Sequence, residues 1–397
     1  MTALSNIRVL DLTNVLAGPF ATELLALCGA EVIKIENPSG GDLARKLGCV
    51  PALNRNLMGT SFLAQNANKK SLTLDLKKES AKEIFLELVI TADVVVENFR
   101  PGVMDRLGIG WSRLRELNPG LVYCAISGFG QTGPDANKPA YDQIIQGLSG
   151  VMAINGDERL NPLRAGFPLC DTVGGVNAAF AIAVALFHRE RTGEGQLIDV
   201  ALLDSIMPLM GWVAANLLIG GQQPVPMGND NFTAAPSGSF RTADGYINIA
   251  ANQQEQWEAV ADVLGLPELK EDARFQERDE RKKNRKRLTP LLEEKLVAQP
   301  TAHWVEALNR KGVPSGEILT LEQALLAPQI EHRQSIGTVD APVAGPIRVF
   351  NLTAKMEKTP GRLETPPPTL SQHTDEILRS LGHDDDEIAA IRASGAV

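Results

Sequence analysis

Asp171 is the side chain whose surroundings in this sequence best suit covalent chemistry. Pro168 restricts the residue before it to an extended conformation, and the apolar run 176–187 predicts a buried helix. Asp171 therefore falls at or near the N-terminus of that helix, where the helix dipole favours an ionised carboxylate. Gly174 and Gly175 carry no side chains, so a bulky ligand could approach the backbone closely. A carboxylate in such a place can act as a nucleophile and form a covalent intermediate.

Two alternatives stay open for this segment. Aspartate is a favoured N-cap residue, so Asp171 could have a purely structural role at the start of the helix. Cys170 is a rival nucleophile, although the sequence around it offers no histidine that could activate the thiol. The local pattern alone does not choose between these roles.

Composition and charge narrow the class of protein. The chain has 397 residues, a net charge of −9 and four cysteines without metal-ligand or disulfide spacing. The negative charge argues against general binding of nucleic acids or acidic membranes, and the cysteine pattern predicts reduced thiols and no metal site. We recognise neither a signal peptide nor an uninterrupted apolar stretch of membrane-spanning length. We therefore expect a cytoplasmic protein that meets anionic ligands with local basic residues.

Apolar runs alternate with helical patterns along the first 220 residues, which predicts a Rossmann-like α/β fold with a parallel sheet covered on both faces. The expected strands span residues 7–12, 31–35, 71–76, 93–97, 121–127 and 195–201. Ligands of such sheets bind at the carboxyl ends of the strands. The composition changes near residue 221, which predicts a large domain over 1–220, a smaller α+β domain over 225–330 and a C-terminal segment over 331–397.

Capping-box spacing predicts two helix starts. Ser80 and Glu83 have this spacing at the start of a helix expected over 80–90, and Thr320 and Gln323 have it before a helix over 321–327. The first side chain of each pair would accept a hydrogen bond from the backbone of the second, and the second would return one. The same helical pattern, without a capping box, predicts one helix over 202–218.

Two further motifs suggest functions that their surroundings argue against. Gly128–Gly133 matches the dinucleotide pattern G-x-G-x-x-G after a strand, but Pro134 prevents the helix whose N-terminus would hold a pyrophosphate. We therefore expect no nicotinamide or flavin cofactor. The basic run 281–287 could suggest nucleic-acid binding, but acidic residues precede it closely, so a solvated helix face is the better interpretation.

Nine short blocks along the chain carry a family resemblance. They are Arg8–Thr13, Ala17–Phe20, Gly29–Glu36, Asn68–Ser71, Leu74–Lys77, Glu97–Gly102, Gly128–Pro134, Arg164–Gly175 and Gly195–Asp204. On these blocks the sequence resembles the class III coenzyme A transferases, a family that also contains formyl-CoA transferase, carnitine CoA-transferase and α-methylacyl-CoA racemase. The resemblance implies an interlocked homodimer in which the segment 331–397 returns to the large domain.

The resemblance also implies that coenzyme A is a substrate, and it names the groove that would bind it. The residues implied are Val15, Ala17, Leu74, Lys77, Asn98, Phe99, Val103, Arg106 and Leu107. Lys77 and Arg106 would supply positive charge for the phosphate groups. Position alone leaves Lys77 open as a solvated lysine and Phe99 open as a core aromatic.

The family resemblance separates two reactions. In the family the aspartate at the position of Asp171 attacks an acyl-CoA thioester. The racemase branch also needs a histidine base where this chain has Tyr141, and a phenol is a poor base at neutral pH. We therefore expect a transferase, with Asp171 as nucleophile and Tyr141 and Asp142 beside it. Asp142 either orients the intermediate or only forms a structural hydrogen bond.

Substrate identity depends on weaker signals. The small domain has 251–257 where formyl-CoA transferases have a run of glycines, which argues against oxalate and formyl-CoA. The segments 216–220, 238–242 and 367–374 resemble transferases that use succinyl-CoA and small dicarboxylic acids such as glutarate. Arg164 is a candidate partner for a substrate carboxylate. The alternatives are a 2-methylacyl-CoA racemase of the same fold and a non-catalytic CoA-binding protein, and no nucleic-acid or membrane partner is expected.

Overall fold

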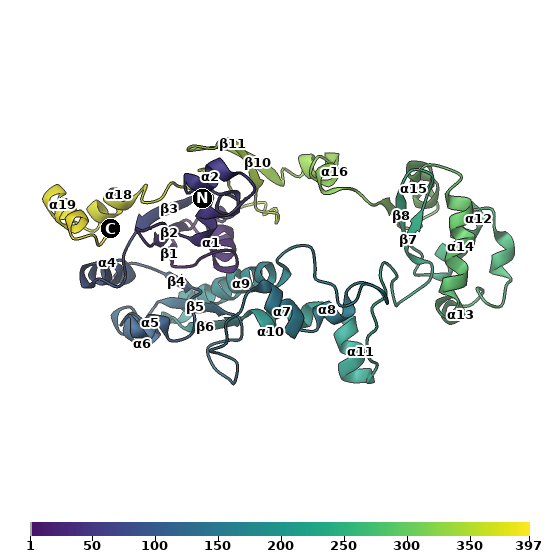
Figure 1. The fold of residues 1–397 in the computed structure, drawn as a ribbon, viewed down its shortest axis with the longest axis horizontal. Coiled ribbons are helices and arrows are strands. Elements are labelled where there is room, and N and C mark those ends of the chain that lie inside the picture. Colours follow the sequence, from purple (N-terminus) through teal and green to yellow (C-terminus); the bar gives the residue numbers. More distant parts are fainter. Residues whose placement is uncertain (1) are drawn as a thin grey trace. The chain divides into compact units, whose positions relative to one another are not determined.

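The computed structural model describes residues 2–397, and the chain divides into two units. The large unit contains the residues up to Val151, Arg164–Gln222 and Gln329–Val397, and the small unit contains Met152–Leu163 and Gln223–Pro328 (Figure 1). Residues 152–163 thus group with the small unit, whereas the sequence pattern placed them in the large domain. Hydrogen bonds explain this grouping, because Gly228 donates its N–H to the Gly156 carbonyl at 2.7 Å and Lys286 pairs with Glu158 at 3.1 Å.

A six-stranded parallel sheet forms the centre of the large unit, as the sequence predicts. Its strands lie in the order β3-β2-β1-β4-β5-β6. Their bounds are β1 Arg8–Asp11, β2 Glu31–Glu36, β3 Lys69–Thr73, β4 Val94–Glu97, β5 Val122–Ser127 and β6 Leu197–Ala201. The order reverses between β1 and β4, and the crevice beyond the carboxyl ends of these two strands is where a ligand of such a sheet binds.

Successive strand residues send their side chains to opposite faces, and each face has its own core. Val9 of β1 packs in the core that contains α1 (Ala17–Leu27) and α9 (Leu169–Thr192). Leu10 packs in the core on the opposite face, which contains α4 (Glu79–Ile90), α6 (Trp111–Leu117), α18 (Thr374–Ser380) and α19 (Asp385–Ala393). The doubly covered sheet predicted from the alternating pattern is confirmed.

The glycines after Asp171 serve packing between elements, which corrects the expectation that they open space for a ligand. A Cβ atom on Gly174 would collide with the side chain of Leu202, and one on Gly175 would lie 2.7 Å from the Ala17 carbonyl oxygen. The missing side chain of Gly174 therefore makes room for Leu202, and that of Gly175 lets α9 pack closely against the start of α1. Both helices consequently begin beside the same crevice.

Helix α9 also corrects the expectation about apolar length. With 24 residues it is long and apolar enough, by length and composition, to cross a membrane. One of its faces, however, carries Cys170, Ala178, Ile182 and Ala185 into the core beside the sheet. Its apolar character therefore has a packing role on that face.

Shorter elements complete the large unit and its connections, and one of them, α8, lies mostly in the stretch 152–163 of the small unit. The predicted helix 202–218 is broken at Gly211, whose φ of +54° ends the first part. The remaining elements are η1 Leu43–Lys46, α2 Pro51–Arg55, α3 Thr60–Leu63, α5 Val103–Arg106, α7 Asp142–Leu148, α8 Val151–Ile154, α10 Leu202–Ile206, η2 Met207–Met210, α11 Trp212–Gly220, α17 Pro328–His332, β10 Ile336–Ala341 and β11 Gly345–Phe350.

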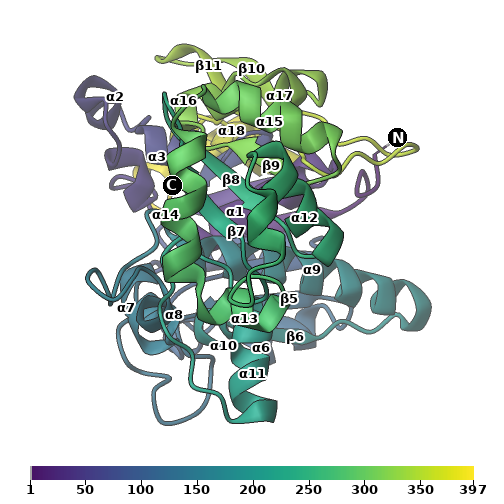
Figure 2. The ribbon, with the colours of Figure 1, turned by 90° about the vertical axis from the view of Figure 1, so that its right-hand side faces the viewer.

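The small unit is an antiparallel sheet with helices packed on it (Figure 2). Its sheet has the order β7-β8-β9, and the core contains the fully buried Trp257 and Phe275. The elements are β7 Ser237–Arg241, β8 Tyr246–Ala250, β9 Ser315–Glu317, α12 Gln254–Val263, η3 Pro267–Lys270, α13 Arg278–Lys283, α14 Arg285–Leu296, α15 Thr301–Arg310 and α16 Leu321–Leu325.

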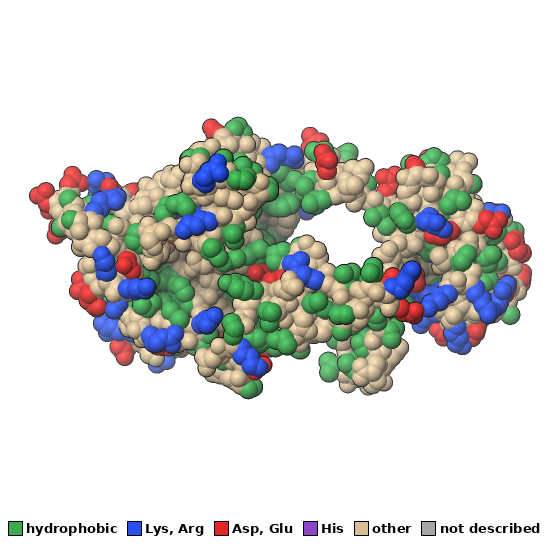
Figure 3. Space-filling view, in the orientation of Figure 1, with side chains coloured by type: hydrophobic (Ala, Val, Ile, Leu, Met, Phe, Trp, Pro, Cys, Tyr) green, Lys and Arg blue, Asp and Glu red, His purple; other side chains and the backbone are tan. Residues whose placement is uncertain are grey.

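The basic run 281–287 is only partly the solvated face that its pattern suggests. Arg281 is fully buried and donates hydrogen bonds to the carbonyls of Ala235, Phe275 and Gln276. Arg285 binds the Ala234 carbonyl at 3.0 Å. Red and blue side chains are intermixed over this unit (Figure 3). Part of the positive charge thus holds the segment that enters β7.

The C-terminal segment belongs to the large unit, as the resemblance implies. It packs along the outer edge of β3, where His373 donates its N–H to the Ser71 carbonyl at 3.0 Å. Ser371 donates its N–H to Ser71 Oγ at 3.0 Å. Asp75 donates its N–H to the Ala396 carbonyl at 2.8 Å, so the last residues lie against the loop after β3.

Candidate active site

A pocket lies in the crevice between β1 and β4, at the carboxyl ends of the strands. It encloses about 240 Å³ and is lined by 13 residues from six stretches of the chain. They are Asn14, Val15, Leu16, Ala17, Asn98, Phe99, Ile126, Ser127, Gly128, Ala140, Tyr141, Asp171 and Leu202. The sheet order alone places a ligand site at this reversal, and Asp171 is the acidic side chain in its lining.

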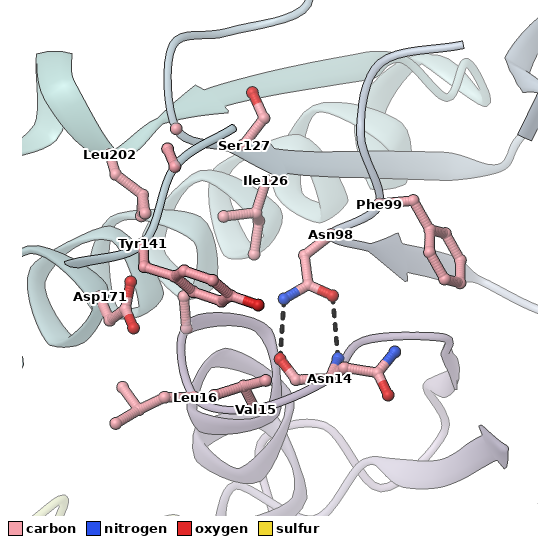
Figure 4. Close-up of a pocket in the computed structure, with 13 residues that line it drawn as sticks. Asn14, Val15, Leu16, Asn98, Phe99, Ile126, Ser127, Tyr141, Asp171 and Leu202 are labelled. Atoms are coloured by element: carbon pink, nitrogen blue, oxygen red, sulfur yellow. Dashed lines mark hydrogen bonds between the residues drawn. The ribbon is translucent and has the colours of Figure 1, made fainter. Parts of the chain in front are cut away.

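Two asparagines join the loops that follow β1 and β4. Asn14 donates its N–H to Asn98 Oδ1 at 2.8 Å, and Asn98 Nδ2 donates to the Asn14 carbonyl at 2.8 Å. Figure 4 shows this pair on one side of the pocket, with Asp171 and Leu202 on the other and the Tyr141 ring between them. The pair fixes the spacing of the two loops at the floor of the crevice.

Asp171 lies in the first turn of α9, which begins at Leu169. Pro168 is the N-cap residue, and no side chain caps the helix from that position. The Asp171 carboxylate accepts no hydrogen bond from any residue in the described range 2–397. The N-cap interpretation of Asp171 is therefore wrong, and its carboxylate is directed to the pocket (Figure 4).

Asp142 takes the capping role instead. Its Oδ1 accepts hydrogen bonds from the backbone N–H groups of Cys170 at 2.8 Å and Asp171 at 3.4 Å. Its Oδ2 accepts one from Gln146 Nε2 at 2.7 Å, and Arg164 lies 3.5 Å away. Asp142 is 6% exposed, so a buried charge satisfies two of the N–H groups that open α9.

The electrostatic setting of Asp171 differs from the one expected from the helix dipole. Burial, followed by the nearby charge of Asp142, raises the pKa of Asp171 from 3.8 to about 6. Both causes disfavour the charged carboxylate and outweigh the dipole. A carboxylate with this pKa is ionised at neutral pH yet held in a site that solvates it poorly, which suits a nucleophile.

Cys170 is unsuited to the nucleophilic role considered for it. Its side chain is fully buried, and burial together with the charges of Asp142 and Asp171 raises its pKa to about 12. A thiol with that pKa holds almost no thiolate at neutral pH. Asp171 is thus the better nucleophile of the two neighbours.

The structure brings together some of the residues implied for coenzyme A and separates others. Val15, Ala17, Asn98 and Phe99 line the pocket. Five do not line it, although they follow β3 and β4 on the same edge of the sheet: Leu74, Lys77, Val103, Arg106 and Leu107. Among these, Leu74 is buried, while Lys77 and Arg106 are exposed and form no ion pair within residues 2–397. Their role in binding coenzyme A stays a prediction.

Tyr141 lies in the pocket with Asp171, whereas Arg164 lies beside Asp142. Tyr141 lines the pocket, is 71% exposed and is the N-cap residue of α7. Arg164 does not line the pocket but lies beside Asp142, and its Nε is buried without a hydrogen-bond partner in the part of the chain that the structure describes. No histidine is among the 13 lining residues.

The glycine loop 128–133 is less free than its composition suggests. Gly130 donates its N–H to Ser127 Oγ at 2.9 Å, and Gln131 donates its N–H to Asp199 Oδ2 at 2.9 Å. Within the described chain, by contrast, the N–H groups of Ala17 and Gly18 in the first turn of α1 have no hydrogen-bond acceptor, and no side chain caps this helix. Available donors therefore lie at the start of α1.

The predicted site residues leave out seven of the 13 lining residues, namely Asn14, Leu16, Ile126, Ser127, Gly128, Ala140 and Leu202. The signal for Ile126 was present, because it is the penultimate residue of β5 at the edge where ligands bind. No local signal marked Ala140 or Leu202. Within residues 2–397 no three His, Cys, Asp or Glu side chains are grouped to hold a metal ion.

Known proteins resemble this chain over most of its length. The succinyl-CoA:glutarate CoA-transferase of Mus musculus is 37% identical over 398 residues, which cover 100% of this chain and 91% of that protein. The acetyl-CoA:oxalate CoA-transferase of Acetobacter aceti is 42% identical over 334 residues, or 83% of this chain and 84% of that protein. A CAIB/BAIF family protein from Brucella suis has a solved structure with a TM-score of 0.84 at 34% identity, covering 96% of this chain and 99% of that one.

The sequence pattern of CoA-transferase family III matches residues 4–374. That range includes all strands of the six-stranded sheet, the whole lining of the pocket and the small unit. The resemblance stated from the nine blocks is confirmed, and the chain belongs to CoA-transferase family III.

Proposed function

We propose that this enzyme transfers coenzyme A from succinyl-CoA to a small carboxylic acid through covalent intermediates on Asp171. The observation that carries the proposal is the free Asp171 carboxylate in the pocket, with its pKa raised to about 6 and its capping role taken by Asp142. The 37% identity to a succinyl-CoA:glutarate CoA-transferase supports succinyl-CoA as the donor.

The reaction would proceed in balanced steps. An oxygen of the ionised Asp171 carboxylate attacks the thioester carbonyl. The C–S bond then breaks, coenzyme A leaves as a thiolate, and a mixed anhydride of Asp171 and the donor acid remains. The thiolate then attacks the aspartyl carbonyl, which gives an aspartyl-CoA thioester and releases the donor acid. The acceptor carboxylate attacks this thioester, and the same steps in reverse give the acceptor's CoA ester and free Asp171.

Each tetrahedral intermediate carries an oxyanion that needs hydrogen-bond donors. The N–H groups of Ala17 and Gly18 at the start of α1 are the better candidates, since the amides of Gly130 and Gln131 already have acceptors. Gly175 lets this first turn of α1 pack closely against α9 near its N-terminal end. Donors and nucleophile would then face one another across the pocket.

Arg164 is the candidate anchor for the distal carboxylate of a dicarboxylic acceptor. Its guanidinium lies 3.5 Å from Asp142 and keeps an unpartnered buried Nε. A guanidinium binds carboxylates through two parallel hydrogen bonds. Glutarate, with its second carboxylate three methylenes away, would reach such an anchor from Asp171 more readily than oxalate.

Acyl exchange tests the proposal directly. Purified enzyme with succinyl-CoA and either glutarate or oxalate should form the new CoA ester, read by mass, with glutarate preferred. Arg164→Met should raise the KM for glutarate and leave the KM for acetate little changed, because acetate has no distal carboxylate. Oxalate as the preferred acceptor would overturn the dicarboxylate assignment, and the absence of any exchange would leave a CoA-binding protein.

We also propose that the enzyme is a homodimer, on the evidence of one helix face. Val176, Phe180, Val184 and Phe187 recur along α9 at helical spacing and are 50–67% exposed. An apolar stripe of this length on a core helix marks an interaction surface. Sedimentation should show no folded monomer on dilution, and a monomer with native circular dichroism at nanomolar concentration would contradict the dimer.

A further inference from the structure

Val15 has a backbone conformation that its side-chain type avoids. Its φ is +69°, in the left-handed region, where a β-branched residue is an outlier. Such a conformation persists only where the surrounding structure enforces it. Val15 lines the pocket in the loop between β1 and α1 (Figure 4). The groups that enforce its conformation therefore shape the wall of the pocket.

Asp42 holds the amide of Val15. The Val15 N–H donates to Asp42 Oδ1 at 2.9 Å, and the Ala44 N–H donates to the same oxygen at 2.9 Å. Asp42 is fully buried, and Lys34 Nζ lies 3.0 Å from its Oδ2. Oδ2 has no hydrogen-bond partner among residues 2–397 apart from this ion pair. The charge of Asp42 is thus stabilised by Lys34.

Lys34 also holds the loop at a second point. From β2 its Nζ donates to the Thr13 carbonyl at 2.8 Å, two residues before Val15. The lysine side chain is fully buried. Burial lowers its pKa, but the carboxylates of Asp11 and Asp42 more than offset this, so the pKa is raised and the amine stays charged.

We propose that Lys34 and Asp42 are positioning residues whose buried ion pair forces Val15 into its left-handed conformation and thereby fixes the pocket wall formed by Val15 and Ala17. Neither residue lines the pocket, so both act through the loop. A relaxed Val15 would return to the extended region and shift the start of α1. The consequence for catalysis rests on the proposed function, in which the first turn of α1 faces the reacting atoms.

The test compares how much kcat falls when the ion pair is removed from two proteins, one that keeps Val15 and one that carries Val15→Gly. The paired substitution Lys34→Met with Asp42→Asn removes both charges, so that no unpaired buried charge remains. We expect it to lower kcat about a hundredfold, the typical effect of misplacing reacting groups by about 1 Å. Glycine adopts a φ of +69° without strain, so in the Val15→Gly background the paired substitution should lower kcat less than about tenfold.

A less deeply buried ion pair at the opposite ends of the strands serves as the control. Arg189 pairs with Asp93 at 2.7 Å just before β4, far from the pocket along the strands. Replacing both, with Arg189→Met and Asp93→Asn, should leave kcat unchanged. If the variant with both Lys34→Met and Asp42→Asn does not fold, the milder single change Asp42→Asn replaces it. This change keeps an oxygen for the Val15 amide, and its effect on kcat is compared in the same way with and without Val15→Gly.

An equal loss of kcat with and without Val15→Gly would overturn the inference, as would a similar loss in the Arg189 and Asp93 control. Coenzyme A affinity, measured by calorimetry on the same four proteins, separates this inference from the proposed function. If wild-type enzyme shows no acyl exchange, the proposed function fails. Even then, the paired substitution should weaken coenzyme A binding, and adding Val15→Gly to it should restore the affinity. An affinity that is not restored would refute the positioning role.

Discussion

Replacing Asp171, the proposed nucleophile, should stabilise the fold while abolishing transfer. The pKa of Asp171 is raised from 3.8 to about 6, by burial first and by Asp142 second, so the ionised carboxylate is disfavoured in the folded state. The folded protein binds more protons at this site than the unfolded chain between pH 3.8 and 6. Stability therefore falls as pH rises through this window, and the full loss is present above pH 6.

Asp171→Asn removes this penalty because asparagine is neutral at every pH. The pKa rise corresponds to at most about 3 kcal/mol, and solvent around a partly buried group reduces it to about 1–2 kcal/mol. The variant should therefore unfold at a higher temperature than wild type at pH 8, by about 2–4 °C for each kcal/mol. At about pH 2.5, more than one unit below both pKa values, the aspartate is protonated in both states and the two proteins should unfold alike.

Activity should change in the opposite direction. Loss of a covalent nucleophile lowers kcat by at least about 10⁴-fold. With succinyl-CoA, wild-type enzyme should accumulate an intermediate that hydroxylamine traps in the peptide containing Asp171, and the variant should not. The wild-type kcat/KM should also fall about tenfold for each pH unit below 6, since the free enzyme must be ionised to react.

Asp204 supplies a matched control, as an exposed aspartate in the first turn of α10. Asp204→Asn should give no stabilisation at pH 8 and full activity, because this carboxylate is solvated. Near-normal turnover by the Asp171 variant, or a label on Cys170, would refute the assignment of the nucleophile. Equal stability of the Asp171 variant and wild type at pH 8 would refute the electrostatic argument.

Three further changes test the surroundings of the nucleophile. Asp142→Asn should move the acid limb of kcat/KM to lower pH, since one cause of the raised pKa of Asp171 is removed, and a pH profile that does not move would contradict this coupling. Gly175→Ala should lower both the unfolding temperature and kcat, because the new methyl would lie 2.7 Å from the Ala17 carbonyl; Gly220→Ala, which meets nothing within 4 Å, is its control. Incubation with a 2-methylacyl-CoA in deuterium oxide should leave the proton next to the thioester unexchanged, because Tyr141 stands where a racemase has its base; deuterium uptake seen by mass would reverse the choice of transferase.

The sheet could be predicted from the sequence because its signal is local. Each predicted strand overlaps an observed one, and the bounds differ by at most three residues, since the apolar runs are short and end at glycine or polar residues. Of the two capping boxes predicted from spacing, only one is present in the structure. Thr320 and Gln323 form the predicted capping box, but α4 begins at Glu79 after Lys78, so Ser80 and Glu83 form none.

Contacts between distant segments could not be predicted from pattern. Asp42 binds the amide of Val15 across 27 residues, and Asp142 caps α9 across 28 residues. Nothing near either aspartate in the sequence indicates its partner. The resemblance named the pocket residues Val15, Ala17, Asn98 and Asp171, but only the fold shows which buried charges hold them in place.

Two roles were considered for Asp171, helix cap and nucleophile, and the structure assigns the capping role to a different residue, Asp142. A capping aspartate gives its carboxylate to backbone N–H groups, which lowers its pKa and stabilises its helix. Here Asp142 accepts those bonds, and Asp171 keeps a free carboxylate with a raised pKa. A buried, unpaired charge lowers stability and makes no structural contact in exchange, so its place in a pocket supports the nucleophilic role that we propose for it.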